Sequence, residues 1–237
     1  MEGGTDEGEA MARPGAETRT GTAKPGSGKR RARKDTRPNE IVAAAFEEFA
    51  ANGYAATRLE DVAARAKVSK GLPYIYFKTK EELFKAVIRS VITPLFDAMR
   101  ERMLGTDLSC EAFLKGPFLA FLQELVLSRR VLIARLLIAE GHKHPELTEF
   151  YYDQVITKAR ETLKAFIDRG VERGEFRPTA LRDFPQLLIA PVLLAVVWRT
   201  LFERHHHLDT DKLLATHIDL LVEAIRAPQA SGTGGAR

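Results

Sequence analysis

Residues 57–83 read TRLEDVAARAKVSKGLPYIYFKTKEEL, and this stretch decides the fold. Its pattern predicts a short helix from Thr57, a tight turn at Lys67-Val68 and a second short helix over residues 69–77. Two short helices joined by a tight turn form the geometry of a helix-turn-helix that reads DNA. Small and apolar residues are expected to form the contact between the two helices: Leu59, Val62, Ala63, Ala64, Ala66, Val68, Leu72 and Phe77.

The second of these helices presents an unusual set of side chains. Hydroxyl, phenol and ammonium groups occur together, and such groups donate hydrogen bonds to DNA phosphates and base edges. Ser69 and Lys70 lie at the expected N-terminus of this helix, where free amides and the helix dipole favour a phosphate. The exposed set is expected to be Ser69, Lys70, Pro73, Tyr74, Tyr76 and Lys78.

Helix-capping signals bound these segments. Thr57 with Glu60 and Thr79 with Glu82 both fit the capping-box spacing. Ser69 is expected to cap the second short helix.

The helical pattern extends from Pro38 to Arg226, because apolar residues recur at three and four and no period-2 alternation is present. Pro38 suits the first position of a helix, and Asn52-Gly53 suits its end. A long helix from Thr79 continues past Pro94, which should bend it. Later helices are expected at about 110–127, 129–140, 145–172, 181–203 and 210–226, giving nine helices and no strand.

The expected fold class is therefore all-α, with two domains. Residues 38–84 would form a three-helix helix-turn-helix DNA-binding domain, and residues 85–226 a larger helical ligand-binding and dimerisation domain. Residues 1–37 and 227–237 are expected to be disordered, because they contain almost no large apolar side chains.

A basic arm, KRRARK at residues 29–34, precedes the first expected helix. Residues 1–37 hold nine Lys/Arg and six acids, whereas residues 38–78 hold five of each. An arm of this kind either keeps the chain soluble or reaches DNA phosphates or a minor groove. In the second case it would supply much of the non-specific attraction, because the helix-turn-helix segment itself is neutral.

Composition excludes several classes of protein. The 237 residues carry 36 Lys/Arg and 32 Asp/Glu, a net charge of +4, with ordinary apolar content and a single cysteine, Cys110. An intramolecular disulfide is impossible, and the longest apolar run, Leu187–Trp198, is too short for a membrane span. The N-terminus shows no signal-peptide pattern, so we expect a cytoplasmic protein.

The stretch around the helix-turn-helix resembles the N-terminal domain of the TetR/AcrR family of bacterial transcriptional regulators. The resemblance covers roughly residues 38–85 without a gap. It implies a homodimer whose two reading helices enter successive major grooves of a near-palindromic operator, and a C-terminal domain that dimerises and often holds a small-molecule inducer. The matching positions are Gly53-Tyr54, Thr57, Asp61-Val62-Ala63, Ala66, Val68-Ser69-Lys70-Gly71, Tyr74, Tyr76-Phe77-Lys78 and Lys80-Glu81-Glu82-Leu83.

Carried over by position, the resemblance implies a set of DNA contacts. Thr57 would cap the second helix and touch a phosphate, and Lys80 would hold a phosphate. Two positions depart from the family pattern: Lys67 stands where glycine is usual in the turn, and Pro73 lacks a donor for a base edge. The implied DNA-binding residues are Thr57, Arg58, Lys67, Ser69, Lys70, Leu72, Pro73, Tyr74, Tyr76, Lys78 and Lys80.

The C-terminal part offers a dimer interface and a cavity. The helix expected at 181–203 is apolar nearly all round and must be covered on several sides, by a second copy or by the core of a monomer. The interface is expected at Leu187, Leu188, Val192, Val196, Leu213, Leu214, His217 and Leu221. Aromatic and methionine side chains either fill the core or line a pocket for an apolar or aromatic inducer, and these are Phe96, Met99, Met103, Phe113, Phe118, Phe121, Leu125, Tyr151, Tyr152 and Trp198.

Other functions have little support in the sequence. The histidines at 142, 144 and 205–207 lack an accompanying Cys or carboxylate cluster, so no metal and no other cofactor is expected. No nucleophile elbow, phosphate loop or metalloprotease motif occurs, so an enzyme is not expected. The preferred interpretation is a repressor released from its operator by an apolar inducer. The alternative is an activator, or a weakly specific binder driven by the arm with no inducer.

Overall fold

The computed structural model describes Met1, the backbone of residues 27–35 and the whole of residues 36–228. The chain divides into two units, Met1–Thr36 and Arg37–Arg237. The expected C-terminal tail lies outside the described residues from position 229 onward.

Helix α1 spans Ser27–Ala56, so it begins before the expected start at Pro38. The described helix includes residues 27–37, for which the sequence predicts disorder, whereas residues 2–26 lie outside the described residues. Lysine, arginine and alanine have high helix propensity, which favours a helix on both sides of Pro38 although Pro38 lacks one backbone hydrogen-bond donor. Gly53 interrupts the helical backbone with φ +79°, at the position where the sequence predicts the helix to end.

The helix-turn-helix is formed by α2 (Leu59–Arg65) and α3 (Leu72–Tyr76). Helix α3 begins later than predicted, and its N-cap is Gly71 rather than Ser69, with no side-chain cap. The capping box at Thr57 is also absent, because Arg58 is the N-cap of α2. The predicted cap at Thr79 is confirmed, since its Oγ1 accepts the amide of Glu82 at 3.1 Å.

Three long helices follow, and each contains a π-helical turn. They are α4 (Lys80–Val87), η1 (Ile88–Ile92) and α5 (Thr93–Gly105); α6 (Cys110–Phe113), η2 (Leu114–Phe118) and α7 (Leu119–Leu127); and α9 (Pro145–Tyr151), η4 (Tyr152–Thr157) and α10 (Lys158–Glu172). Prolines explain two of the turns: Pro94 follows η1 and Pro117 lies inside η2, and each lacks the amide that a regular helix would use.

With each continuous run counted once, the described residues form nine helices, as predicted. The remaining helices are α8 (Val131–Glu140), α11 (Ala190–Leu201) and α12 (Thr210–Ile225), with short 3₁₀ turns at Gly141–Lys143, Ala180–Arg182 and Pro185–Leu188. No strand is present in the described residues, where only an isolated bridge joins Phe176 and Arg226. None of the described helices is long and apolar enough to cross a membrane.

Helix α11 is shorter than predicted. The sequence predicts a helix from residue 181, but the chain forms two 3₁₀ turns before α11 begins at Ala190. Pro185 and Pro191 explain the difference, because each starts a new helical segment instead of lying inside one.

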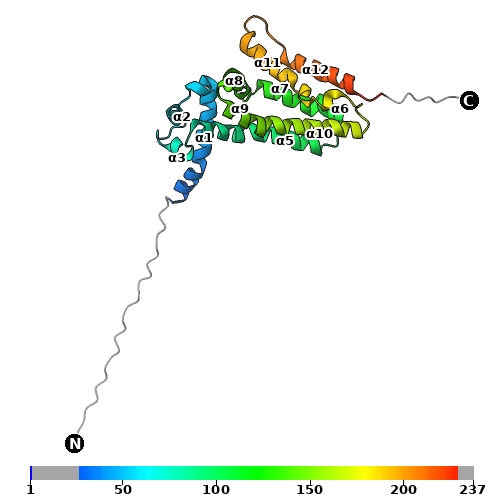
Figure 1. The fold of residues 1–237 in the computed structure, drawn as a ribbon. Coiled ribbons are helices and arrows are strands. Elements are labelled where there is room, and N and C mark those ends of the chain that lie inside the picture. Colours follow the sequence, from blue (N-terminus) through cyan, green and yellow to red (C-terminus); the bar gives the residue numbers. More distant parts are fainter. Residues whose placement is uncertain (2–26, 229–237) are drawn as a thin grey trace, which may run out of the picture. The chain divides into compact units, whose positions relative to one another are not determined.

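Buried side chains form two clusters within the second unit. One joins α1, α2 and α4 to α8 and α9, and the other joins α5, α6, α7, α10 and α12. Figure 1 shows α5, α7 and α10 running side by side, with α11 and α12 along one flank. The core beneath the helix-turn-helix is therefore continuous with helices of the C-terminal part.

Candidate DNA-binding surface and ligand cavity

The turn between α2 and α3 keeps the tight form that a glycine would allow. Lys67 has φ +54°, and the amides of Lys67 and Val68 donate to the carbonyl oxygens of Ala64 (3.1 Å) and Ala63 (3.0 Å). A lysine in this left-handed conformation carries strain of about 1–2 kcal/mol. The turn has therefore not been reshaped, and the Lys67 side chain projects into solvent.

Six of the predicted DNA-binding residues are exposed around this turn, namely Arg58, Lys67, Ser69, Lys70, Tyr74 and Lys78. The Tyr74 hydroxyl donates to Glu60 Oε1 at 2.8 Å, which connects α3 to α2. This bond raises the pKa of the Tyr74 phenol. The pKa of Glu60 is lowered, first by a backbone hydrogen bond and then by Tyr74.

Four other predicted contacts serve the protein's own structure. Thr57 is 2% exposed, and its hydroxyl donates to the Gly53 carbonyl oxygen at 2.7 Å. Pro73 is buried, while Leu72 and Tyr76 are half-buried against the core below α3. A helix of only five residues needs such an anchoring face. Burial removes Thr57 and Pro73 from the exposed surface, whereas the DNA contacts expected of Leu72 and Tyr76 stay predictions.

Lys80 is also corrected. Its Nζ donates to the carbonyl oxygens of Tyr54 (2.7 Å), Ala55 (3.0 Å) and Thr57 (3.1 Å). All three ammonium donors are thereby used, and none remains for a phosphate. Burial lowers the pKa of Lys80.

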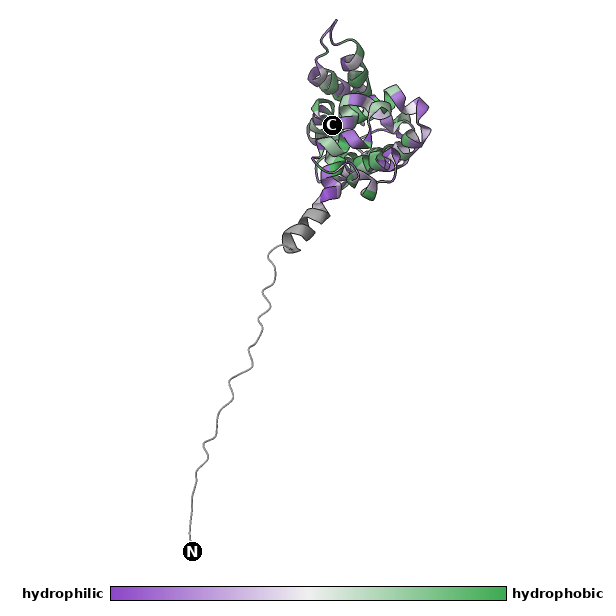
Figure 2. Cartoon of the chain, turned by 90° about the vertical axis from the view of Figure 1, so that its left-hand side faces the viewer, coloured by the Kyte–Doolittle hydropathy of each residue, from purple (hydrophilic) through white to green (hydrophobic). Residues whose placement is uncertain are grey.

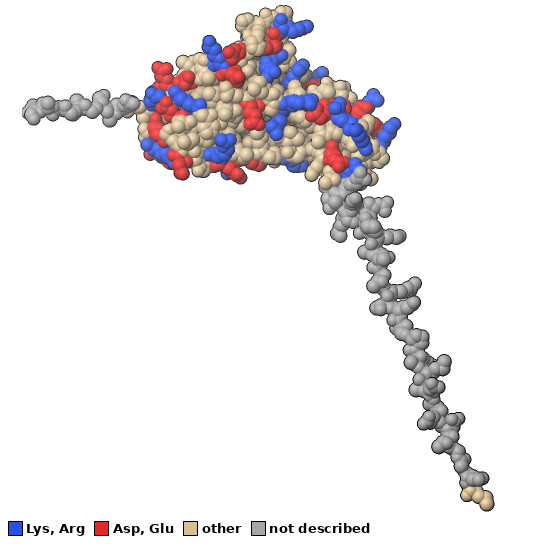
Figure 3. All heavy atoms as spheres, turned by 180° about the vertical axis from the view of Figure 1, so that it is seen from behind, with Lys and Arg blue, Asp and Glu red and all other residues tan. Residues whose placement is uncertain are grey.

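Ile75 is an exposed residue that the sequence analysis did not select. Its side chain is 75% exposed on α3, between Tyr74 and Tyr76. The sequence does contain a signal for this exposure. Pro73 and Tyr76 are three residues apart and share the inner face of α3, whereas Ile75, two residues after Pro73, lies on the opposite face. Basic and acidic side chains are interspersed over the face of the molecule seen in Figure 3.

An apolar cavity of about 530 Å³ lies among the C-terminal helices. Five of the predicted pocket residues line it: Phe96, Phe121, Leu125, Tyr151 and Tyr152. The sequence analysis missed the wall contributed by α8 and α11, which includes Val131, Ala134, Leu137, Ile138, Val192 and Val196. A cavity of this size falls in the range that holds a small organic molecule.

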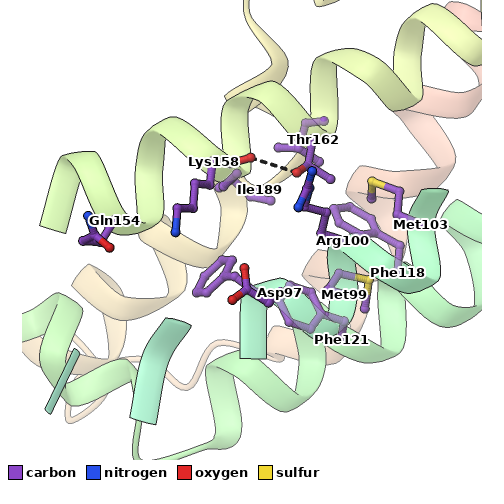
Figure 4. Close-up of a pocket in the computed structure, with 13 residues that line it drawn as sticks. Asp97, Met99, Arg100, Met103, Phe118, Phe121, Gln154, Lys158, Thr162 and Ile189 are labelled. Carbon is purple, nitrogen blue, oxygen red and sulfur yellow. Dashed lines mark hydrogen bonds between the residues drawn. The ribbon is translucent and has the colours of Figure 1, made fainter. Parts of the chain in front are cut away.

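Met99, Met103 and Phe118 line a second, smaller cavity of about 40 Å³ (Figure 4). It shares Phe96 and Phe121 with the larger cavity. Phe113 and Trp198 line neither cavity, so their predicted roles there are wrong.

Phe113 is buried in the core, and its ring packs against Phe166 with 5.4 Å between the ring centroids. Trp198 packs on Phe202, and its indole N–H donates to the His206 carbonyl oxygen at 2.9 Å.

Few polar groups face the larger cavity. Arg130 lines it, and its Nε is buried without a hydrogen-bond partner. Burial raises the pKa of the Tyr151 phenol to about 12. In the described residues no group of three or more His, Cys, Asp or Glu side chains is placed to hold a metal ion.

Helix α8 connects the cavity to the helix-turn-helix. Its last residue, Glu140, accepts the backbone amides of Tyr54 (3.0 Å) and Ala55 (2.7 Å) at the end of α1. Just before α8, Arg129 forms an ion pair of 2.6 Å with Glu47 of α1. Both ends of a cavity-lining helix are thus joined to the helix that precedes the DNA-reading elements.

The predicted dimer interface is only partly exposed. Leu188, Val196 and Leu214 are buried in the chain's own core, so they cannot contact a second copy. Leu187 is exposed, and Val192, Leu213, His217 and Leu221 are half-buried or exposed at their edges, with His217 Nε2 2.8 Å from the Leu187 carbonyl oxygen. A sequence that is apolar all round does not indicate which face is covered.

The exposed apolar face of this region is a different set of residues. Figure 2 shows hydrophobic and hydrophilic residues alternating along the helices of the chain. The exposed large side chains in this region are Phe184, Leu187, Leu193, Leu194, Leu201, Phe202 and Leu220.

Two short helices with exposed hydroxyl, phenol and ammonium groups, set on an all-helical body with an apolar cavity, define a DNA-binding regulatory protein of the helix-turn-helix class. Two family models match the chain: "Bacterial regulatory proteins, tetR family" over residues 41–87, and "Tetracyclin repressor-like, C-terminal domain" over residues 114–216. The HTH-type transcriptional repressor KstR2 of Mycolicibacterium smegmatis is 30% identical over 146 residues, which cover 60% of this chain and 69% of that protein. The chain belongs to the TetR family and is a transcriptional regulator.

Two solved structures have the same fold. FadR from Bacillus subtilis, in complex with stearoyl-CoA, matches with a TM-score of 0.61 and 19% identity over 79% of this chain and 99% of that one. The ketosteroid transcriptional regulator KstR2 of Mycobacterium tuberculosis matches with a TM-score of 0.57 and 20% identity, over 81% of this chain and 96% of that one.

Proposed function

We propose that this regulator is a homodimeric repressor that leaves its operator when an apolar small molecule enters the C-terminal cavity. The observation that carries the proposal is the cavity of about 530 Å³, whose walls are almost entirely apolar. Removing apolar surface of a ligand from water stabilises such a complex by about 25 cal/mol per Å². The matched proteins agree with this ligand class, since one holds stearoyl-CoA and another is named a ketosteroid regulator.

The homodimer follows from the need to read DNA with a small element. Helix α3 has only five residues, and one copy reaches few base edges. Two copies related by a two-fold axis would place two such helices in successive major grooves of a near-palindromic operator. The exposed leucines of α11 and α12 offer the apolar surface for that contact. Such a protein would work in the bacterial cytoplasm, in association with the nucleoid.

The DNA contact itself is proposed for the six exposed residues around the turn, together with Ile75. Lys70 and Lys78 would contact phosphates, and Ile75 would contact a thymine methyl group. Replacing Lys70 with alanine should weaken binding to all sequences and flatten the salt dependence, whereas Ile75→Ala should mainly reduce sequence preference.

The proposal is tested by selecting bound fragments of the source genome at about 150 mM salt, where purely electrostatic binding weakens. A repressor dimer should recover a two-fold motif with half-sites about one helical turn apart. A reporter gene placed behind that fragment should then be silenced by the protein. Activation of the reporter would establish the activator instead, and recovery of no motif would overturn sequence-specific regulation.

The basic arm gives a separate prediction. If residues 29–34 reach DNA, replacing their five Lys/Arg with glutamine should flatten the log–log salt slope, while the preferred sequence stays the same. The slope should fall by roughly 0.9 for each phosphate that the arm no longer neutralises. It is measured by titrating one selected fragment at several salt concentrations. An unchanged slope would leave the arm a solubilising tail.

A further inference from the structure

A basic cavity of about 280 Å³ adjoins the apolar cavity. It lies where the loop after α7 meets α8 and the end of α11, and it shares Val131 and Val196 with the apolar cavity. Arg129, Arg135 and Arg199 line it, and no acidic residue of the described chain lines either cavity. The two cavities are therefore neighbours with opposite character, one apolar and one cationic.

Two of these three guanidinium groups have no ion pair among the described residues. Arg129 is paired with Glu47 at 2.6 Å. Arg199 donates only to a backbone carbonyl oxygen, that of Val126, at 2.9 Å. Arg135 is exposed, and within the described part of the chain no ion pair to a carboxylate is formed by its guanidinium group. The cavity thus holds uncompensated positive charge beside an apolar wall.

Arg130 extends this cationic region to the apolar cavity itself. It follows Arg129 in the chain, lines the apolar cavity, and has a buried Nε without a hydrogen-bond partner. Oε1 of Glu124 lies 3.8 Å from Arg130 Nη1, at the limit of an ion pair. A buried donor without a partner is costly, and an anionic ligand atom would satisfy it.

We propose that the ligand is an amphipathic anion, with an apolar body in the larger cavity and a carboxylate, sulfonate or phosphate group among Arg135, Arg199 and Arg130. Guanidinium groups bind such oxyanions through paired, charge-assisted hydrogen bonds. The two cavities meet at Val131 and Val196, which line both, and the proposed ligand spans this shared wall. This inference rests on the proposed function and specifies the class of ligand that it requires.

A matched pair of fluorescent probes distinguishes binding of the apolar body from binding of the anionic group. 1-Anilinonaphthalene-8-sulfonate and N-phenyl-1-naphthylamine share an apolar body, but only the first is anionic. We expect both to bind the full-length protein saturably, with the sulfonate bound about fivefold more tightly or better. Arg135→Gln should reduce this preference and leave the affinity of the neutral probe unchanged.

Two variants serve as controls. Arg102→Gln, at an exposed residue of α5 that lines neither of these cavities, should leave both affinities unchanged. Ala134→Phe fills the apolar cavity and should weaken both probes. Raising the salt concentration should weaken only the sulfonate.

The outcomes distinguish the inference from the proposed function. Equal affinities for the two probes, or a sulfonate preference that Arg135→Gln does not reduce, would overturn the anionic subsite and leave the apolar cavity in place. If neither probe binds saturably, or if Ala134→Phe leaves both unaffected, the cavity does not take an apolar molecule. In that case the proposed function fails, and the inference fails with it.

Discussion

Among the described residues other than glycine, Lys67 alone has a positive φ. A glycine adopts this conformation without strain but has more freedom to lose on folding. Lys67→Gly should therefore raise the free energy of unfolding by about 0.5–1 kcal/mol, measured by urea denaturation of the full-length protein. Lys70→Gly is the control, because φ of Lys70 is not positive and only the entropic loss applies. Equal destabilisation by both substitutions would contradict the strain at Lys67.

Two buried tyrosines make stability sensitive to alkaline pH. Burial raises the pKa of Tyr54 to about 12, with added effects of Glu146 and Glu81, and burial raises the pKa of Tyr151 to about 12. Between about pH 10 and pH 12 the unfolded phenols ionise while the folded ones keep their protons, so stability falls as the pH rises through this range.

The loss is expected to reach up to about 2 kcal/mol for each phenol, since one pKa unit corresponds to about 1.4 kcal/mol. Tyr54→Phe and Tyr151→Phe should each reduce the difference between unfolding free energies measured at about pH 9 and about pH 11.5. Tyr152→Phe is the control, because its side chain is exposed. The same pH dependence of the unfolding free energy in all three variants would show that the phenols of Tyr54 and Tyr151 are not its cause.

At the scale of elements, Glu140 at the end of α8 forms hydrogen bonds with the backbone at the end of α1. Glu140→Ala would leave the amides of Tyr54 and Ala55 without their acceptor, at a cost of about 1–3 kcal/mol of unfolding free energy. Glu140→Gln retains one acceptor oxygen and should cost less. Glu149→Ala removes an exposed carboxylate from the neighbouring helix α9 and should be close to neutral. A Glu140→Ala protein as stable as Glu149→Ala would show that the two amides are satisfied in another way.

The helices were largely predictable from the sequence, because their apolar spacing is strong and several of their ends carry capping or glycine signals. Pro185 and Pro191 are visible in the sequence, but whether a proline kinks a helix or starts a new one depends on the packing around it. The site was harder to predict. Some residues of α3 pack against the core and others face solvent. In a helix of only five residues, the spacing of apolar residues does not show which residues do which.

Lys80 illustrates what the sequence could not indicate. A lysine at the start of a helix beside a DNA-reading element suggests a phosphate contact. The end of α1 and Thr57 just after it bring three carbonyl oxygens to the same place, and this arrangement depends on the fold of the chain. The α8 wall of the cavity was missed for a similar reason, because contacts between distant helices leave no local pattern.

For the whole molecule, the proposed homodimer gives a prediction at the exposed leucines of α11 and α12. Leu220 is 62% exposed on α12 and lines neither cavity. Leu220→Glu would place a charge in the proposed two-fold interface, so sedimentation should show a dimer for the wild type and a monomer for the variant. Leu108→Glu, an exposed leucine in the loop before α6, should leave the dimer intact. A monomeric wild-type protein would refute the interface.

Each of the three π-helical turns holds an extra residue compared with a regular helix, and each residue advances a helix by about 100°. Deleting one residue inside such a turn can restore a regular helix there, whereas a deletion elsewhere would rotate every later side chain away from its partners. Length differences of a single residue among related regulators should therefore gather at residues 88–92, 114–118 and 152–157. These turns are places where an ancestral helix could gain a residue without losing its fold, and where the faces on either side could then diversify separately.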